Sequence, residues 1–379
     1  MSRINSKRTS SGMSAWRSLN ENERSSKVSL ACIWILLVGA KLAPVNATAQ
    51  DVARVSEAKS LLEAVEAGRF ALQSYDVLIV QEELSDRLAA GVTEQTYRRR
   101  IAFDAATGNG VYLEFSETRQ VDPPVGQPGI RNLTADRTPQ DNSAPLDEHL
   151  HEHLQRRIRG WISTDGREVL SRVFPKQAGV LERSFAEHCL ATRIPDPRCI
   201  GVYLLDQHPQ PWVSNRAEAL HGVAAHLVAL RESPAGAMVV ARFPASDAQP
   251  FFVPETRLTI DPHRFVMVEQ RLGVFDASKN RNFDDYYAAT TDYGEVDGIH
   301  VPVRYFAETT ASGARDASGQ RTRGQRIIDV RLYWLAVNPE SGLQMPDATV
   351  LNDVANVLKM TDPDLVVPRV VAGPSTSGE

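Results

Sequence analysis

The sequence lacks the motifs that mark the best-known catalytic sites. It has no Gly-x-Ser-x-Gly turn for a hydrolase nucleophile, no phosphate-binding loop and no dinucleotide-binding fingerprint. Its cysteines and histidines show no spacing that suggests a nucleophile beside its base. We therefore predict that the protein is not an enzyme and that it holds no cofactor.

The chain also lacks an excess of basic residues. With 42 Lys and Arg against 47 Asp and Glu, its net charge is −5 at pH 7. Residues 1–49 hold seven of the basic and two of the acidic residues, so the remaining chain has a net charge of −10. Because nucleic acids bind to basic surfaces, we predict no nucleic-acid partner. The same charge argues against docking on anionic lipid by charge alone.

The apolar run at residues 28–40 is shorter than the about 20 residues that a membrane-spanning helix needs. A basic segment precedes this run, and the small residues Ala47 and Ala49 follow it. This order is typical of a secretory signal peptide cleaved between Ala49 and Gln50. An uncleaved anchor is the alternative, and Met13 is an alternative start. We predict a periplasmic or secreted protein with no stable transmembrane segment after cleavage.

Only two cysteines, Cys189 and Cys199, lie beyond this signal. Ten residues apart and in an oxidising compartment, they favour a disulfide, and two buried free thiols are the alternative. Three histidines, His149, His151 and His153, would line one face of a strand and could meet a zinc ion. The alternative is a solvated charged stretch, because nothing nearby in the sequence would hold them rigid. We predict no metal site and leave the histidines open.

Period-two alternation of apolar residues predicts a mainly β fold. Strands are expected at residues 75–84, 96–104, 111–116, 156–164, 167–174, 238–243, 257–261, 264–275, 286–293, 299–309 and 325–336. Tight turns such as Asp165-Gly166 join neighbouring strands as hairpins, which makes the sheet antiparallel. With so few helices, the sheet must curl to keep one face dry. We predict an incomplete antiparallel β-barrel or strongly curved sheet.

Helical periodicity predicts an N-terminal helix over residues 51–70 and a covering central helix from Ser214 or Asn215 to about residue 232. Asp347 caps a final short helix. The polar, Pro- and Gly-rich residues 118–147 predict a mobile surface insertion in one domain that spans residues 50–360. Residues 361–379 are expected to form a flexible tail.

Three consecutive arginines at residues 98–100 form the densest basic run. On a strand they alternate between the two faces, and Arg99 shares its face with Tyr97 and Ile101. Arg99 can therefore point toward the concave side of a curved sheet. The alternative is that all three arginines are exposed and form ion pairs.

Two segments, residues 256–269 and 286–305, carry a resemblance to a known family. Their turn motifs are Asp261-Pro262, then Tyr293, Val296-Asp297-Gly298-Ile299 and Pro302. Together with the leading helix and first strand, they resemble the LolA/LolB-like outer-membrane lipoprotein-sorting superfamily. The resemblance implies an incomplete β-barrel with helices over its open side. In that superfamily some members hold lipoprotein acyl chains against the concave face, and others act as envelope-stress sensors.

Two functions follow from this resemblance and the missing catalytic motifs. The first is an extracytoplasmic binding protein that holds a lipid acyl chain or another hydrophobic ligand in a concave β-sheet groove. Each buried CH₂ group would contribute about 0.8 kcal/mol. The alternative is an envelope sensor or scaffold that acts through protein-protein contacts and fills its groove with its own side chains. The two differ in whether the concavity is empty or packed.

Overall fold

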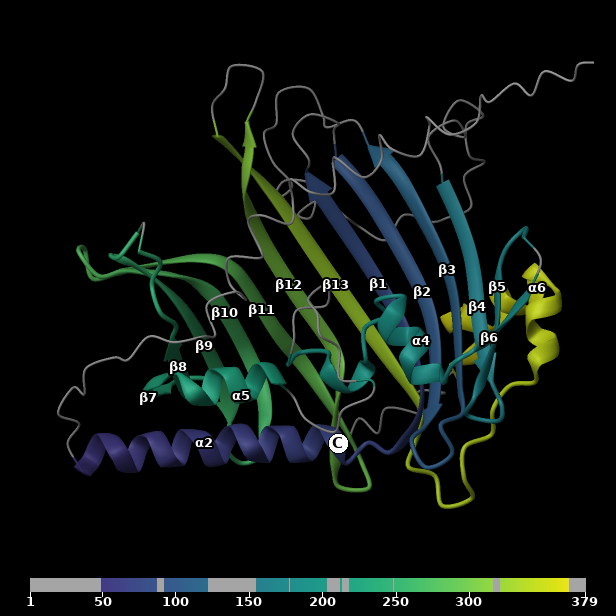
Figure 1. Cartoon of the computed structure of the whole chain (residues 1–379), viewed down its shortest axis with the longest axis horizontal. Coiled ribbons are helices and arrows are strands. Elements are labelled where there is room, and N and C mark those ends of the chain that lie inside the picture. Colours follow the sequence, from purple (N-terminus) through teal and green to yellow (C-terminus); the bar gives the residue numbers. More distant parts are fainter. Residues whose placement is uncertain are drawn as a thin grey trace, which may run out of the picture.

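The protein is built on one antiparallel sheet of 13 strands with helices on both of its faces (Figure 1). The computed structural model describes residues 49–86, 92–121, 155–176, 178–202, 212, 218–247, 249–315 and 321–367. The first strands are β1 (Ser74–Asp86), β2 (Val92–Asp104), β3 (Gly110–Val121), β4 (Gln155–Ser163), β5 (Glu168–Val173) and β6 (Gly179–Glu182). The second group is β7 (Leu227–Ser233), β8 (Gly236–Arg242), β9 (Phe252–Asp261), β10 (Val266–Asp276), β11 (Arg281–Val296), β12 (Ile299–Arg315) and β13 (Arg321–Val337).

The strand order is β6-β5-β4-β3-β2-β1-β13-β12-β11-β10-β9-β8-β7. The first and last strands are therefore neighbours in the middle of the sheet, where Tyr75 pairs with Val337. The Asn338 side chain accepts hydrogen bonds from the backbone N–H groups of Gln73 and Ser74, both at 2.9 Å. Strands β6 and β7 each have one partner, so the sheet is open. The predicted fold, a mainly β protein with an incomplete antiparallel barrel, is confirmed.

The sheet is curved, and the helices α2 (Ala49–Phe70), α4 (Phe185–Ala191) and α5 (Glu218–Ala225) lie inside the curve (Figure 1). The 3₁₀ turn η2 (Pro197–Cys199) contacts α2 on this side. We call this side of the sheet the concave face. Helix α2 runs along the base of the strands, as its apolar spacing predicts. Its residues Ala58, Leu61, Leu62 and Val65 are buried in a cluster with β8 to β10 and α5.

The outer side of the sheet is covered only near one end. There η4 (Ala348–Asn352), α6 (Val354–Thr361) and α7 (Pro363–Val366) follow β13, and α6 packs against β2, β3 and β4. Leu351 and Val357 bury Val111 and Leu113, whose neighbours in the same strand face inward. Near this end, strands β2 to β4 are therefore buried on both faces, whereas the outer faces of β9 to β13 carry charged side chains.

The structure differs from the sequence-based expectation in several elements. The central helix ends at Ala225, and the next residues, Leu227–Ser233, form the edge strand β7 instead of its last turns. Residues 118–121 of the predicted insertion are the end of β3, and 363–366 of the predicted tail form α7. Helix α4, which was not predicted, starts with a capping box between Ser184 and Glu187.

The signal sequence lies outside the described residues, so export and cleavage between Ala49 and Gln50 stay predictions. Both of these residues fall in the first turn of α2. Within the described part of the chain, no helix is long and apolar enough to cross a membrane.

Candidate functional site: the concave face

The concave face changes character along its strands. At the base, which is the α2 end, its side chains are apolar and include Tyr75, Val77, Ile101 and Phe103. Toward the other end of the same strands, alternate residues are polar or charged. We call these the polar cluster: Gln81, Glu83, Gln95, Tyr97, Arg99, Tyr112, Glu114, Arg159 and Arg326.

Aromatic side chains from outside the sheet cover the apolar base. The ring of Phe185, the first residue of α4, stacks on Phe103 with 5.8 Å between ring centroids, and Trp212 meets Phe103 edge-on at 5.6 Å. The Trp212 indole N–H donates to the Ile194 carbonyl at 2.7 Å. Gly110 leaves room for Phe185, since a Cβ there would lie 2.3 Å from the ring. This part of the concave face is packed by the protein's own side chains.

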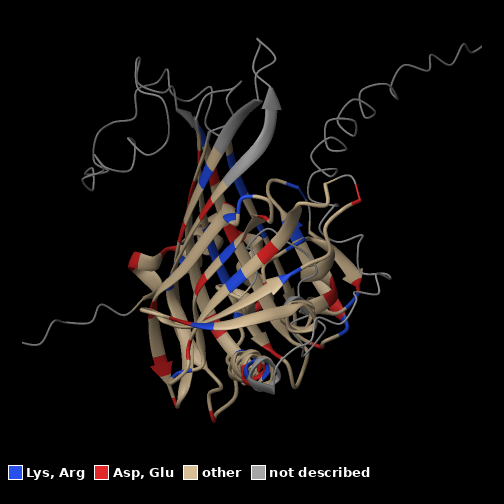
Figure 2. Ribbon diagram, turned by 90° about the vertical axis from the view of Figure 1, so that its left-hand side faces the viewer, with Lys and Arg blue, Asp and Glu red and all other residues tan. Residues whose placement is uncertain are grey.

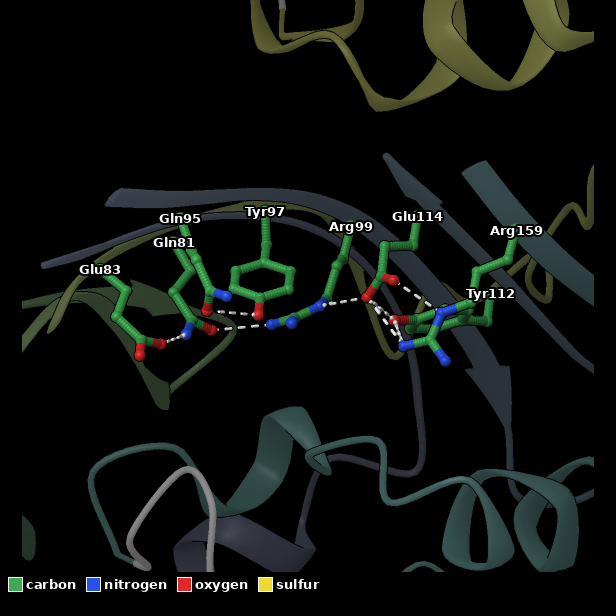
Figure 3. Close-up of polar contacts among 8 residues, drawn as sticks. All are labelled: Gln81, Glu83, Gln95, Tyr97, Arg99, Tyr112, Glu114 and Arg159. Atoms are coloured by element: carbon green, nitrogen blue, oxygen red, sulfur yellow. Dashed lines mark hydrogen bonds and ion pairs between the residues drawn. The ribbon is translucent and has the colours of Figure 1, made fainter. Parts of the chain in front are cut away.

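Glu114 lies at the centre of the polar cluster (Figure 3). Its Oε2 accepts from Arg99 Nε at 2.9 Å and from Arg159 Nη2 at 3.0 Å, and its Oε1 accepts from Arg159 Nε at 2.6 Å. The Tyr112 hydroxyl also donates to Oε2. Arg99 comes from β2, Tyr112 and Glu114 from β3, and Arg159 from β4, so the pairing of three strands assembles this group.

From Arg99 the polar contacts continue across β1 to β13. Arg99 Nη1 donates to Gln81 Oε1 at 2.7 Å, and its guanidinium lies 4.1 Å above the centre of the Tyr97 ring. Gln81 in turn donates to Glu83, which accepts from Arg326 Nε at 2.6 Å and Nη2 at 2.8 Å. One connected set of contacts therefore spans five strands, from β4 through β3, β2 and β1 to β13. Figure 3 shows the part of it from Arg159 to Glu83.

Burial and charge act in opposite directions on Glu114, whose residue is 1% exposed. Burial alone would raise the pKa of Glu114, but the charge of Arg99 and the hydrogen bonds and charge of Arg159 lower it to about 2. Burial, followed by the charge of Glu114, raises the pKa of the Tyr112 hydroxyl. At neutral pH the carboxylate is therefore charged and the phenol neutral.

These protonation states make the cluster a poor acid–base catalyst. Glu114 already accepts bonds from three side chains, and its low pKa leaves it no proton to donate at neutral pH. Arg99 and Arg159 share one carboxylate, that of Glu114, so this end of the cluster holds two positive charges against one negative charge. The arrangement is suited to hold a polar or anionic group rather than to transfer a proton.

The outer face has ion pairs too, and on β9 to β13 they are more exposed than those of Glu114, whereas the Arg100–Asp76 pair beneath α6 is largely buried. Arg304 pairs with Asp329 at 2.8 Å while 54% of its side chain remains exposed, and Asp284 contacts both Arg257 and Arg271. Figure 2 shows acidic and basic residues distributed along these strands. Exposed pairs of this kind contribute little to stability, so they serve as a reference for the buried cluster.

Arg99 faces the concave side of the sheet, as the alternation of residues along its strand predicts, and is 8% exposed. The prediction missed Glu114, which accepts from Arg99, and Arg159, which shares Glu114 with it. Glu114 shares a face with Tyr112 on the predicted third strand, which was a usable signal. Arg159 lies across a strand pair joined by a long connection, and the sequence gives no sign of that contact.

The two cysteines are not brought together as a disulfide in the structure. Both thiols are free and buried: Cys189 packs in the cluster at the base of the concave face, and Cys199 packs in the cluster around α2. The Trp161 indole N–H points at the Cys189 sulfur, 3.5 Å away. The disulfide stays a prediction that a thiol count on exported protein would test.

The sequence offered three histidines as candidate zinc ligands. His149, His151 and His153 lie outside the described residues. In the described ranges, no three His, Cys, Asp or Glu side chains lie together in a way that could hold a metal ion.

The fold is similar to several solved structures. They include a LolA superfamily protein from Nitrosomonas europaea (12% identity, 78% of this chain and 96% of that chain, TM-score 0.32). A DUF1329 family protein from Desulfovibrio piger has 8% identity over 80% of this chain and 99% of that chain, with a TM-score of 0.31. LprF from Mycobacterium bovis has 13% identity over 77% and 97%, with a TM-score of 0.27.

The first of these structures has the superfamily name that the turn motifs suggested. No protein-family model matches this chain, and no curated protein matches its sequence. All three TM-scores lie below 0.5, so we base the function on this chain's own residues.

Proposed function

We propose that the protein is an extracytoplasmic binding protein that holds a lipid or another hydrophobic ligand against the concave face of its sheet, without catalysis. The observation that carries this proposal is the division of the concave face into an apolar base and a cationic polar cluster on the same strands. A lipid has an apolar chain joined to a polar end, so its two parts would match the apolar base and the polar cluster. Arg99 and Arg159 would then lie at the polar end of the ligand.

The cover over the base is compatible with an exchangeable ligand. It consists of short segments, such as the seven-residue α4 and the residue Trp212, rather than a second sheet. A ligand would take the place of Phe185 or Trp212 against Phe103 and would recover the apolar area that these side chains lose. Binding would therefore require movement of the cover but no break in the sheet.

A second function, an envelope sensor or scaffold that acts through protein-protein contacts, is favoured by one observation. Phe185 and Trp212 already fill the base of the concave face, so its apolar residues are satisfied without a ligand. In that case the buried side chains would serve only the fold.

Native mass spectrometry of the mature protein, purified from its own envelope without detergent and then extracted with organic solvent, separates the two functions. A carrier shows a discrete added mass that extracts as lipid. Displacement of a fluorescent fatty-acid probe then measures affinity. A bare chain that neither retains lipid nor binds the probe contradicts the carrier function.

A matched pair of variants locates the ligand. Phe185→Ala removes part of the cover over the concave face, whereas Phe306→Ala makes the same change on β12, whose Phe306 pairs with Asp329 on the outer side. We expect Phe185→Ala to increase probe binding several-fold and Phe306→Ala to leave it unchanged. Equal effects of the two variants would place the ligand elsewhere.

A further inference from the structure

A depression at the base of the sheet lies away from the polar cluster and has no role in the proposed function. It is about 200 Å³ in volume and lies between the last turns of α2, the β9–β10 turn and the β11–β12 turn. Its lining residues are Ala64, Val65, Gly68, Arg69, Ala71, Arg264, Phe265, Val266, Gly298, Ile299 and His300. Added Cβ atoms at Gly68 and Gly298 would meet nothing within 4 Å, so both glycines leave its sides open.

Arg69, one of these lining residues, is 3% exposed and has unused hydrogen-bonding capacity. Its Nη2 donates to the Tyr293 hydroxyl at 3.0 Å, and that hydroxyl donates to the Met267 carbonyl at 2.6 Å. Its Nη1 is buried and has no hydrogen-bond partner. A buried guanidinium is costly unless an anion or a full set of acceptors compensates it.

The carboxylates around the depression are bonded to other cations. Asp261 accepts from Arg264 Nε at 2.7 Å, and Glu66 on α2 lies 3.3 Å from His221. On the β11–β12 hairpin, Glu295 is 4.0 Å from His300. The lining contains two arginines and a histidine but no acidic residue among the residues that the structure describes. Arg264 has a carboxylate partner, whereas Arg69 has none among the described side chains.

A second polar atom without a partner lies near the Arg69 guanidinium. The Thr290 hydroxyl on β11 is buried and makes no hydrogen bond. A Cβ at Gly201 would lie 2.5 Å from Thr290 Oγ1 and 3.7 Å from Arg69 Nη2, which places both groups beside the same glycine. The buried guanidinium therefore has a second polar group near it whose hydrogen-bonding capacity is also unused.

The apolar part of the lining projects outward. Phe265 is 46% exposed and has a backbone φ of 51°, in the left-handed region that a bulky residue rarely adopts. Its ring stands beside Arg264 at the edge of the depression. The site thus combines a buried cation with an exposed aromatic side chain.

We propose that this depression binds a phosphate group, either as free phosphate or as the phosphate of a lipid headgroup, with Arg69 as its main cation. Arginine suits this role because its planar fork can donate two parallel hydrogen bonds to one oxyanion. Arg69 supplies a buried charge that no carboxylate balances within the described part of the chain, Arg264 supplies a second charge at the rim, and the ligand balances the buried charge. The proposal does not rest on the concave-face ligand.

Isothermal titration of the mature full-length protein with inorganic phosphate tests the first source. We expect saturable binding that Arg69→Met weakens by at least about tenfold, as loss of a charge-assisted hydrogen bond predicts. Arg264→Gln, at the exposed rim, should weaken binding less. Arg304→Gln on the outer face is the matched control and should bind as the wild type does. No binding by the wild type to either phosphate or lipid, or equal binding by Arg69→Met, overturns the proposal.

Vesicles of phosphatidylglycerol test the second source by co-sedimentation. Vesicle binding that inorganic phosphate competes away and Arg69→Met abolishes assigns the site to a headgroup, whereas phosphate binding without vesicle binding assigns it to the free ion. A thermal unfolding scan separates a ligand site from a structural arginine. Without phosphate, Arg69→Met should unfold at or above the wild-type temperature, and only the wild type should gain stability when phosphate is added. A large fall in the unfolding temperature of Arg69→Met that phosphate does not change would contradict the proposal.

Discussion

At the base of the concave face, Phe185 and Trp212 cover Phe103 with aromatic rings, whereas higher on the same strand Arg99 meets Glu114 through ionic hydrogen bonds. The base depends on apolar area, which tolerates a shift of a side chain as long as the space stays filled. The polar cluster depends on partners in fixed positions, because a buried charge that loses its partner cannot recover it from water. One strand therefore carries two kinds of packing that respond to mutation in different ways.

The largest difference between the two regions should appear when the central carboxylate is removed. In Glu114→Gln, Arg99 and Arg159 lose their shared counter-ion while they remain buried, so we expect a loss of about 3–5 kcal/mol in the free energy of unfolding. Chemical denaturation measures it. Glu117→Gln is the control on the same strand: Glu117 pairs with Arg156, whose side chain is 55% exposed, and should change stability by less than about 1 kcal/mol. A similar loss in both variants would show that the buried cluster contributes no more stability than an exposed ion pair.

Acid should weaken the polar cluster before it affects the apolar base. The folded-state pKa of Glu114, about 2, lies below its ordinary value of 4.5, so the unfolded chain binds a proton more readily between these values. The stabilisation is complete above pH 5 and is lost as the pH falls toward 2, by about 3 kcal/mol in total. Denaturation curves of the wild type and Glu114→Gln at several pH values should converge over this window. Parallel curves would exclude Glu114 as the cause.

The smallest of the three effects should come from crowding the base. A methyl group at Gly110 would lie 2.3 Å from the Phe185 ring, so Gly110→Ala should cost about 1–3 kcal/mol as α4 shifts away. Gly179→Ala, in the edge strand β6, meets nothing within 4 Å and should be nearly neutral. Thermal unfolding of the two variants measures the difference. A neutral Gly110→Ala would mean that the cover over the base is loosely held.

Local patterns in the sequence predict the strands and the orientation of Arg99, because each depends on residues one or two positions apart. They do not predict the pairing of Arg159 with Glu114, which requires β3 and β4 to be neighbours. The segment Leu227–Ser233 shows how a local pattern misleads. Its leucines suit a helix that continues α5, but hydrogen bonds to β8 make it a strand.

The sequence contains a signal for helix α4 but none for the burial of Arg69. Helix α4, which carries Phe185, begins with Ser184 and Glu187, a capping-box spacing that could have revealed it. Arg69 has no such signal. At the end of an amphipathic helix, a basic residue is normally solvated and favourable for the helix dipole. Only the turns that pack against α2 show that this one is buried.

The position of β1 beside β13 determines when the sheet can form. Gln73 and Asn338, which are bonded beside this strand pair, lie 265 residues apart in the sequence. The middle of the sheet therefore cannot assemble until nearly the whole chain has been synthesised, and such distant pairings make folding slow. Before that point each half of the meander ends in an unpaired strand. A chain with this strand order therefore keeps its two central strand edges open until synthesis is nearly complete.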